Sequence, residues 1–291
     1  MYADGNALEN HTLPGMTVGV DNSWIQAALA ARDVRFIRRH LPRVRAVSRY
    51  FRGEVHGIDN IPASGPALIV GNHNGLMQPA ESWVMTAAIW DRFGAERELF
   101  FLGHDMVFRF PAIANPFRKS GAIPAHPEVA ATALRRGALV VVYPGGDVDA
   151  CRPFSQRHRI VFAGRMGFIR LAIECAVPIV PAVSVGAHET VLILSDGRRL
   201  ARRLGFKRLF RSEVLPLALS FPWGLTIGPT YYFPLPAKVE VEMGAPIDLC
   251  HLPKAAAREP ETVTRCYGHV VDTMQKSLDR MASGRRWPII G

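Results

Sequence analysis

Short apolar runs alternate along this chain with longer segments in which apolar residues recur at helical spacing. Apolar runs bounded by glycine, proline or polar residues are typical of buried strands. The predicted strands are 67–70, 99–103, 121–124, 138–143, 177–185 and 238–243. The predicted helices are 79–93, 127–136, 167–175 and 261–282. This alternation predicts an α/β fold with a mixed, largely parallel sheet flanked by helices.

The N-terminal part has a different pattern. Residues 1–22 look irregular, and Asn22 or Ser23 can then cap a helical segment in which arginines separate the apolar positions. Pro42 is expected to break or kink it. We predict one or two amphipathic helices, which either pack on the core with an arginine outer face or contact a membrane. The chain thus divides into a tail with an amphipathic helical arm, 1–50, and one domain, 51–291.

Charge adds a class of partner to this picture. The 291 residues carry a formal net charge of +10, with a sequence pI near 9.9. Many of the basic residues lie in two clusters that are interleaved with Leu, Phe and Ile, a texture that suits a membrane interface. These clusters are Arg32, Arg35, Arg38, Arg39, Arg43, Arg45 and Arg49, and Arg198, Arg199, Arg202, Arg203, Lys207, Arg208 and Arg211. We expect peripheral contact with an anionic membrane and no binding to nucleic acid, because no known nucleic-acid module is recognisable.

The cysteines and the N-terminus indicate the compartment. Cys151, Cys175, Cys250 and Cys266 form no C-x-x-C pair and no disulfide framework, which fits a reducing environment. The N-terminus has no basic segment followed by an apolar one, so no signal peptide is predicted. The expected location is the cytoplasmic face of a membrane.

One long segment, 214–237, contains no charged residue. It also contains five prolines, which disfavour a regular helix that spans a bilayer. An apolar loop or hairpin is expected instead, either packed on the core or dipping into a bilayer.

Candidate chemistry lies in VGNHNGLMQPAE, residues 70–81, directly after a predicted strand. Ligand-binding loops gather at strand ends in an open α/β sheet. A glycine-flanked histidine, His73, suits a general base, and Glu81 is the next acid along the chain that could orient it. The alternatives are that His73 caps backbone groups and that Glu81 serves the start of its own helix, with Gln78 as N-cap.

A second loop, YPGGDVDACRPF at 143–154, also follows a buried strand. Its two glycines allow close approach of the backbone to a ligand, and Arg152 can pair with a phosphate or carboxylate. Alternatively, Arg152 is tied to Asp147 or Asp149. The chain has no Walker A loop, G-x-G-x-x-G or G-x-S-x-G motif, which disfavours nucleotide-binding enzymes and α/β-hydrolases.

Five blocks in order resemble the glycerolipid acyltransferase family, which includes the 1-acylglycerol-3-phosphate acyltransferases. GEVHGIDNIPASGPALIVGNHNG resembles the segment that carries the family's catalytic N-H-x4-D motif, with His73 on the histidine. The other four blocks are GAIPA, YPGGDVDACRPF, VPIVPAV and KVEVEMGAPIDL. The resemblance runs from about Gly53 to Leu249 and identifies residues 51–291 as an acyltransferase domain.

Two departures from the main branch of the family bear on the substrate. Gln78 stands where that branch has Asp, and Gly145 stands where it has the Glu linked to phosphorylated acceptors. Both changes resemble the branch of transmembrane-protein-68-like and diacylglycerol-type acyltransferases, in which Glu81 would take the acid role. A neutral acceptor, such as an acylglycerol or a long-chain alcohol, becomes more credible than a lysophospholipid.

The resemblance implies an O-acyltransferase in which His73 is the general base, Glu81 orients it, and acyl-CoA is a co-substrate. It implies no metal or redox cofactor, and an acyl carrier protein remains open as the alternative donor. The implied substrate-binding residues are Asn72, Gly75, Arg118, Lys119, Gly145, Gly146, Asp147, Arg152 and Arg165. Asp105, next to His104, and Asp147 are the rival acids. A catalytically silent lipid-binding protein on the same fold is the alternative function.

Overall fold

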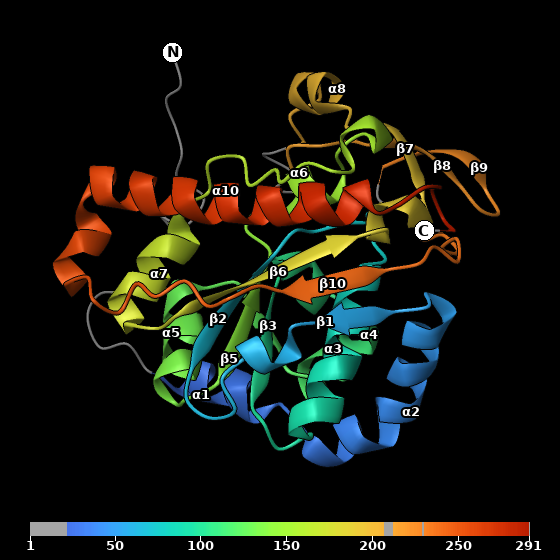
Figure 1. Cartoon of the computed structure of the whole chain (residues 1–291). Helices are drawn as coiled ribbons and strands as arrows, with labels where there is room; N and C mark the ends of the chain where they lie inside the picture. Colours follow the sequence, from blue (N-terminus) through green and yellow to red (C-terminus); the bar gives the residue numbers. More distant parts are fainter. Residues whose placement is uncertain (1–21, 207–211, 229, 291) are drawn as a thin grey trace.

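The apolar runs of the sequence form the strands of one large sheet (Figure 1). The computed structural model describes residues 22–206, 212–228 and 230–290, with the backbone only of residues 105 and 106. The strand order is β1-β10-β6-β2-β5-β3-β4, and every neighbouring pair is parallel except β10 with β6. The strands are β1 (Glu54–His56), β2 (Ala67–Gly71), β3 (Leu99–Gly103), β4 (Ala122–Pro124), β5 (Leu139–Val142), β6 (Ile179–Val185) and β10 (Glu240–Met243). The predicted mixed, largely parallel sheet is confirmed.

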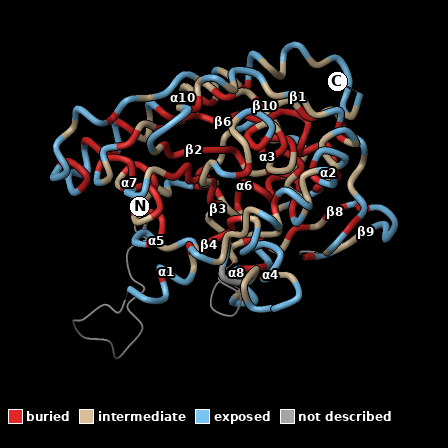
Figure 2. Tube along the Cα trace, turned by 90° about the horizontal axis from the view of Figure 1, so that it is seen from below, coloured by how far each residue is buried: buried red, intermediate tan, exposed pale blue. Residues whose placement is uncertain are grey.

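Helices cover both faces of this sheet because successive strand residues point to opposite sides. In β2, Leu68 and Val70 join one apolar cluster, whereas Ala67 and Ile69 join the other. The first cluster packs against α1 (Ser23–Ala30), α5 (Pro127–Arg135), α7 (Gly167–Cys175) and α10 (Pro260–Ser283). The second packs against α2 (Val34–Tyr50) and α3 (Ala80–Phe93). Figure 2 shows the buried residues concentrated along β2, β6 and α3.

The predicted arm consists of two helices that pack on the sheet domain. Ile37 and Val44 of α2 are buried in the second cluster, so its arginines form the outer face. The break lies at residues 31–33, where the Asp33 side chain accepts a hydrogen bond from Phe36 N at 3.0 Å. Of the two effects expected of Pro42, the break is wrong, because α2 continues through that residue. The tail at 1–21 and the basic positions 207, 208 and 211 lie outside the described residues.

A small antiparallel sheet of three strands stands beyond the end of β6 (Figure 1). Its strands are β7 (Leu192–Ser195), β8 (Leu217–Ser220) and β9 (Gly224–Ile227). The uncharged segment 214–237 therefore contributes a β-hairpin, one of the two forms expected from the sequence. Within the described part of the chain, no helix combines the length and the hydropathy that crossing a bilayer requires.

Among the described residues, the remaining helices are short. They are α4 (Pro111–Lys119), α6 (Gly146–Ala150) and α8 (Arg198–Arg203). Single 3₁₀ turns are η1 (Ile58–Asn60), η2 (Asp105–Phe108), η3 (Phe154–Gln156), η4 (Ala187–Thr190) and η5 (Lys254–Arg258).

Candidate active site

His73 lies in the turn between β2 and α3, at the carboxyl end of the sheet. This turn reverses sharply, because Gly75 has φ 69° and Leu76 has φ 50°. A side chain at Gly75 would also bring its Cβ within 2.8 Å of the Gln78 carbonyl oxygen. The helix begins one residue later than predicted, with Pro79 rather than Gln78 as N-cap.

The turn brings His73 and Glu81 into contact. Nδ1 of His73 lies 2.9 Å from Oε1 of Glu81. The same oxygen accepts the Asn74 backbone N–H at 3.0 Å, so Glu81 serves the turn and not the start of its own helix. The Glu81 side chain is 3% exposed and that of His73 is 22% exposed. The geometry therefore holds one ring nitrogen against a buried carboxylate and leaves the His73 side chain partly exposed.

The backbone of His73 is fixed from the second loop. Its N–H donates to Asp149 Oδ2 at 2.6 Å, and its carbonyl accepts from Arg152 Nη1 at 2.7 Å. Arg152 and Asp149 are themselves paired at 2.9 Å, and both are buried. Burial raises the pKa of Asp149 and lowers that of Arg152, while their mutual attraction opposes both shifts.

Arg152 consequently lies inside the protein and not at a ligand-facing surface. Its guanidinium also donates to Asn74 Oδ1 and to the carbonyl oxygens of Gln156 and Arg157. The tie to Asp149 that the sequence left open is present. The position argues against a direct contact of Arg152 with a substrate phosphate, because its side chain is 1% exposed.

Asn72 is likewise part of the internal framework. Its side chain accepts the Ser184 backbone N–H at 2.8 Å and donates to the Ser184 carbonyl at 3.0 Å. Asn74 donates to Ser184 Oγ at 2.7 Å. These bonds join the end of β2 to β6 and leave Asn72 fully buried. It is placed to shape the loop, and it presents no exposed surface to a ligand.

An aromatic ring supports the His73 imidazole. The Tyr143 ring stacks on it with centroids 4.7 Å apart and an interplanar angle of 22°. The Tyr143 hydroxyl bonds with Ser82 Oγ at 2.7 Å, and burial raises its pKa, so the phenol stays neutral. Gly71 is needed at the end of β2, because a Cβ there would lie 2.6 Å from the Tyr143 ring.

The glycines of the second loop are held in a tight turn. The N–H of Gly146, one of the implied substrate-binding residues, donates to the Tyr143 carbonyl at 3.0 Å and is therefore engaged in the turn. Arg165 donates to the Gly145 carbonyl and to Asp147 Oδ1, each at 2.9 Å. A Cβ at Gly145 would meet the Val161 carbonyl at 2.4 Å. Close packing is therefore one reason for glycine at this position.

Asp147, one of the rival acids, forms its hydrogen bonds with residues outside the histidine turn. It accepts hydrogen bonds from Arg165, from Ser212 Oγ at 3.1 Å and from the Glu213 N–H at 2.9 Å. The acid in contact with the His73 ring is Glu81. The side chain of the other rival, Asp105, is outside what the structure describes.

The predicted basic pair Arg118 and Lys119 lies at the opposite end of the sheet from His73. Both end α4, directly before the amino end of β4, whereas His73 follows the carboxyl end of β2. Because these strands run in the same direction, Arg118 and Lys119 lie at the amino ends of the strands and His73 lies at their carboxyl ends. Lys119 instead lines a surface hollow of about 520 Å³ together with α2 residues, among them Arg35, Arg39 and Arg43.

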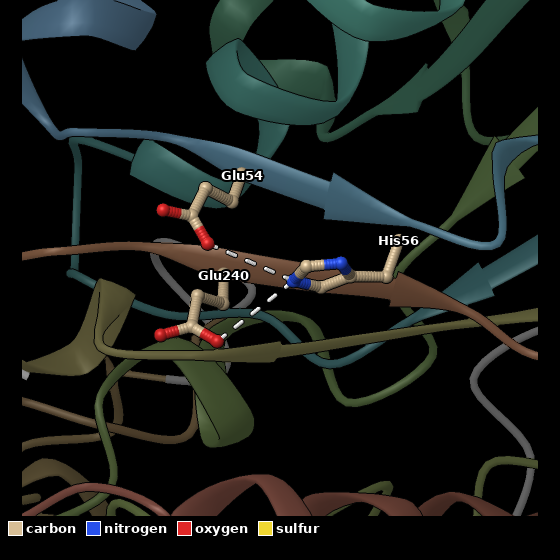
Figure 3. A group of neighbouring side chains, drawn as sticks. All are labelled: Glu54, His56 and Glu240. Carbon is tan, nitrogen blue, oxygen red and sulfur yellow. Dashed lines mark ion pairs between the residues drawn. The ribbon is translucent and has the colours of Figure 1, made fainter.

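Within the described residues, one group brings three possible metal ligands close together: Glu54, His56 and Glu240, on β1 and β10 (Figure 3). His56 Nε2 lies 3.8 Å and 3.9 Å from the two carboxylates. The Lys238 ammonium pairs with the same two carboxylates at 3.2 Å and 3.3 Å. Arg285 Nη1 also lies 3.8 Å from Glu240, so both carboxylates already have cationic side chains as neighbours.

Several residues that build the site carry little signal in the sequence. They are Tyr143, Ser184 and Tyr232. The Tyr232 hydroxyl donates to the Gly75 carbonyl at 2.6 Å. Asp149 is expected from the sequence only as a partner for Arg152. The signal that could have singled out Tyr143 and Asp149 is position: Tyr143 ends the predicted strand 138–143, and Asp149 lies in the loop that follows it.

Comparison with known proteins identifies related chains. Residues 52–185 match the family model described as acyltransferase. A protein of Mycobacterium tuberculosis described as uncharacterized is 34% identical over 237 residues, 81% of this chain and 63% of that protein. A Bos taurus protein named "DGAT1/2-independent enzyme synthesizing storage lipids" is 29% identical over 227 residues, 78% of this chain and 59% of that protein.

A solved structure, the 1-acyl-sn-glycerophosphate acyltransferase PlsC from Thermotoga maritima, aligns with 89% of this chain and 88% of that chain. The TM-score is 0.47 and the sequence identity is 15%. The chain spans somewhat less than two thirds of the length of the mycobacterial and bovine relatives. The family resemblance drawn from the sequence is confirmed by the family model.

Proposed function

Residues 52–185 form an acyltransferase domain, and on this premise we propose that the chain moves a fatty acyl group from an acyl thioester to a hydroxyl of a lipid acceptor. His73 is the general base and Glu81 orients it. The observation that carries this proposal is the 2.9 Å contact of His73 Nδ1 with a buried carboxylate, in a side chain that stays 22% exposed.

Glu81 fixes the proton of the imidazole. A carboxylate only accepts hydrogen bonds, so Nδ1 carries the proton in this contact and Nε2 keeps its lone pair. The ring is also held by Tyr143 on one face. The hydrogen bonds of the His73 backbone to Asp149 and Arg152 fix the position of the backbone from which the ring extends. A base oriented in this way needs little rearrangement to reach an acceptor hydroxyl.

The reaction follows from this arrangement. Nε2 takes the proton of the acceptor hydroxyl while its oxygen attacks the thioester carbonyl carbon. The tetrahedral intermediate then breaks its carbon–sulfur bond, and the imidazolium returns the proton to the leaving thiolate. An ester and a free thiol result. The Glu81 carboxylate stabilises the imidazolium between the two steps.

We further propose acyl-CoA as the donor and a neutral glycerolipid or alcohol as the acceptor, with a lysophospholipid as the less favoured acceptor. The name of the Bos taurus relative, an enzyme synthesizing storage lipids, supports an acceptor of this class. Gly145 in place of the family's usual glutamate, which is linked to phosphorylated acceptors, supports it as well. Arg165 is the candidate that remains for an anionic group of the donor, because its side chain is 27% exposed.

Peripheral attachment to the cytoplasmic face of an anionic membrane belongs to the same proposal. The exposed arginines of α2 and α8 support it. We expect vesicles that contain anionic lipid to retain the protein and salt to weaken this retention. Retention that is indifferent to lipid charge would contradict the electrostatic part.

The test is release of free thiol from long-chain acyl-CoA in mixed micelles. Diacylglycerol, monoacylglycerol, a fatty alcohol and lysophosphatidic acid are offered one at a time. Release that depends on an acceptor and is lost in His73→Ala supports the proposal and names the acceptor class. Equal release by both proteins, or none with any acceptor, favours the alternative of a catalytically silent lipid-binding protein.

A further inference from the structure

The hairpin formed by β8 and β9 has one face that is apolar and uncovered. Leu219 pairs across the strands with Leu225, and Leu217 pairs with Ile227. Leu219 is 50% exposed, and Leu225 and Ile227 are still more exposed. The opposite face, with Ala218, packs against the core. Monomeric proteins rarely leave a continuous apolar face of this kind in water.

The tip of the hairpin and the segment after it extend the same apolar character. Phe221, Trp223, Tyr231 and Phe233 are all more than half exposed. The Trp223 indole N–H donates to the Tyr231 carbonyl at 2.7 Å, so its polar group already has a partner inside the protein. Aromatic side chains of this type favour the boundary between lipid and water.

The charges beside the hairpin select the partner. Helix α8 carries the exposed residues Arg199, Arg202 and Arg203. Leu200, between them, and Leu204, directly after the helix, are exposed as well. The helix adjoins the hairpin, because Leu215 N donates to the Asp196 carbonyl at 3.0 Å just before α8 begins. Anionic headgroups would neutralise these arginines while the apolar face meets the acyl chains. A second copy of the chain would bring its own arginines to the rim of such a contact.

The inner face of the hairpin is attached to the histidine turn. Ala218 and Tyr232 share an apolar cluster with Leu76 and Val148. The Tyr232 hydroxyl also donates to the Gly75 carbonyl at 2.6 Å. A surface that receives the hairpin therefore lies close to the turn that carries His73.

We propose that the β8–β9 hairpin is a membrane-docking element that seats the histidine turn at the surface of an anionic bilayer. This proposal names the part of the chain that makes the proposed peripheral attachment. Its link to catalysis rests on the proposed function. Docking is shallow, because β9 is an edge strand whose outer backbone groups have no partner in hydrocarbon. The acceptor lipid then reaches His73 from the bilayer without crossing bulk water.

The test compares single polar substitutions in binding to phosphatidylcholine vesicles that contain phosphatidylglycerol. Trp223→Ser and Leu225→Ser change exposed side chains and are expected to weaken vesicle affinity roughly tenfold each. The matched control is Trp287→Ser, a similarly exposed tryptophan outside the hairpin, which is expected to change nothing. Unchanged affinity in both hairpin variants would overturn the proposal.

A second measurement reports on Trp223 itself. Lipids brominated on their acyl chains quench the fluorescence of a tryptophan that reaches them. Trp223→Phe keeps an apolar ring at the tip, so vesicle binding is expected to persist while most of the quenching disappears. Equal quenching in the wild type and in Trp223→Phe would overturn the proposal. The proposal would also be overturned if the wild type were a dimer, and if the hairpin substitutions dissociated this dimer without changing vesicle binding.

Turnover by the wild-type chain of a short-chain acyl-CoA and a water-soluble alcohol, without vesicles, tests the proposed function separately. If vesicle affinity depends on the hairpin but this turnover is absent, the docking proposal stands and the catalytic proposal fails. If turnover is present but the hairpin substitutions leave vesicle affinity unchanged, the catalytic proposal stands and the docking proposal fails.

Discussion

His73 and His56 each lie within ion-pair distance of a glutamate, and they differ in nearly every physical respect. His73 contacts a buried carboxylate at 2.9 Å, whereas His56 lies 3.8 Å from one exposed carboxylate and 3.9 Å from another carboxylate. The turn of His73 is bonded through its backbone to Asp149 and Arg152. The carboxylates beside His56 are already paired with Lys238. Composition alone does not separate the two groups; burial and the surrounding hydrogen bonds do.

Among substitutions of the residues around His73, Glu81→Gln should have the largest effect. A glutamine can hold the ring but cannot stabilise the imidazolium or select the Nδ1 proton as a carboxylate does. We expect turnover to fall about 10²- to 10⁴-fold with little change in the circular dichroism spectrum. Glu240→Gln, beside His56, is the control and should leave turnover unchanged. Normal turnover in Glu81→Gln would contradict the assigned role.

Asp149→Asn should have the second largest effect, a decrease in the free energy of unfolding. It leaves the buried Arg152 guanidinium without its charged partner, and breaking a buried pair in this way costs about 3–5 kcal/mol. Urea denaturation monitored by fluorescence measures this loss. An unchanged midpoint would mean that the turn does not depend on the pair.

Tyr143→Phe should have a smaller effect. It keeps the ring that stacks on His73 and removes the hydroxyl that bonds with Ser82. The loss of one such hydrogen bond costs about 1 kcal/mol. Turnover should stay near that of the wild type, because the stacked ring is retained. A loss of turnover as large as that in Glu81→Gln would instead give the hydroxyl a direct part in the reaction.

Asp147→Asn tests the remaining acid through the pH dependence of stability. Burial alone would raise the pKa of Asp147, but the Glu213 N–H, Arg165 and Ser212 outweigh it and lower the pKa. Its stabilising contribution is therefore complete above the unfolded pKa, about 3.9, and is lost as the pH falls through the folded pKa. The variant should be less stable than the wild type at pH 7, and the difference should shrink below about pH 4. A difference that is the same at both pH values would contradict this.

The sequence predicted the parts of the molecule that depend on local pattern. The buried strands and the position of His73 after one of them follow from apolar runs. The spacing left the pairing of His73 with Glu81 open against capping roles, and the family resemblance favoured it; the structure contains the contact between these two side chains. Arg152 and Asn72 could not be assigned in this way, because their hydrogen-bond partners come from distant loops and strands. The same holds for Arg118 and Lys119, whose distance from His73 depends on the order of the strands. Pro42 does not break α2, because the packing of α2 on α3 outweighs one missing hydrogen bond.

The comparison between the two histidines is tested most directly by acceptor-dependent thiol release from acyl-CoA in three proteins: the wild type, His73→Ala and His56→Ala. We predict that His73→Ala loses about 10²- to 10⁴-fold in rate while His56→Ala keeps the wild-type rate. Thermal unfolding of all three shows that the variants are folded. An equal loss in both variants, or an undiminished rate in His73→Ala, would contradict the assignment of His73 as the catalytic base.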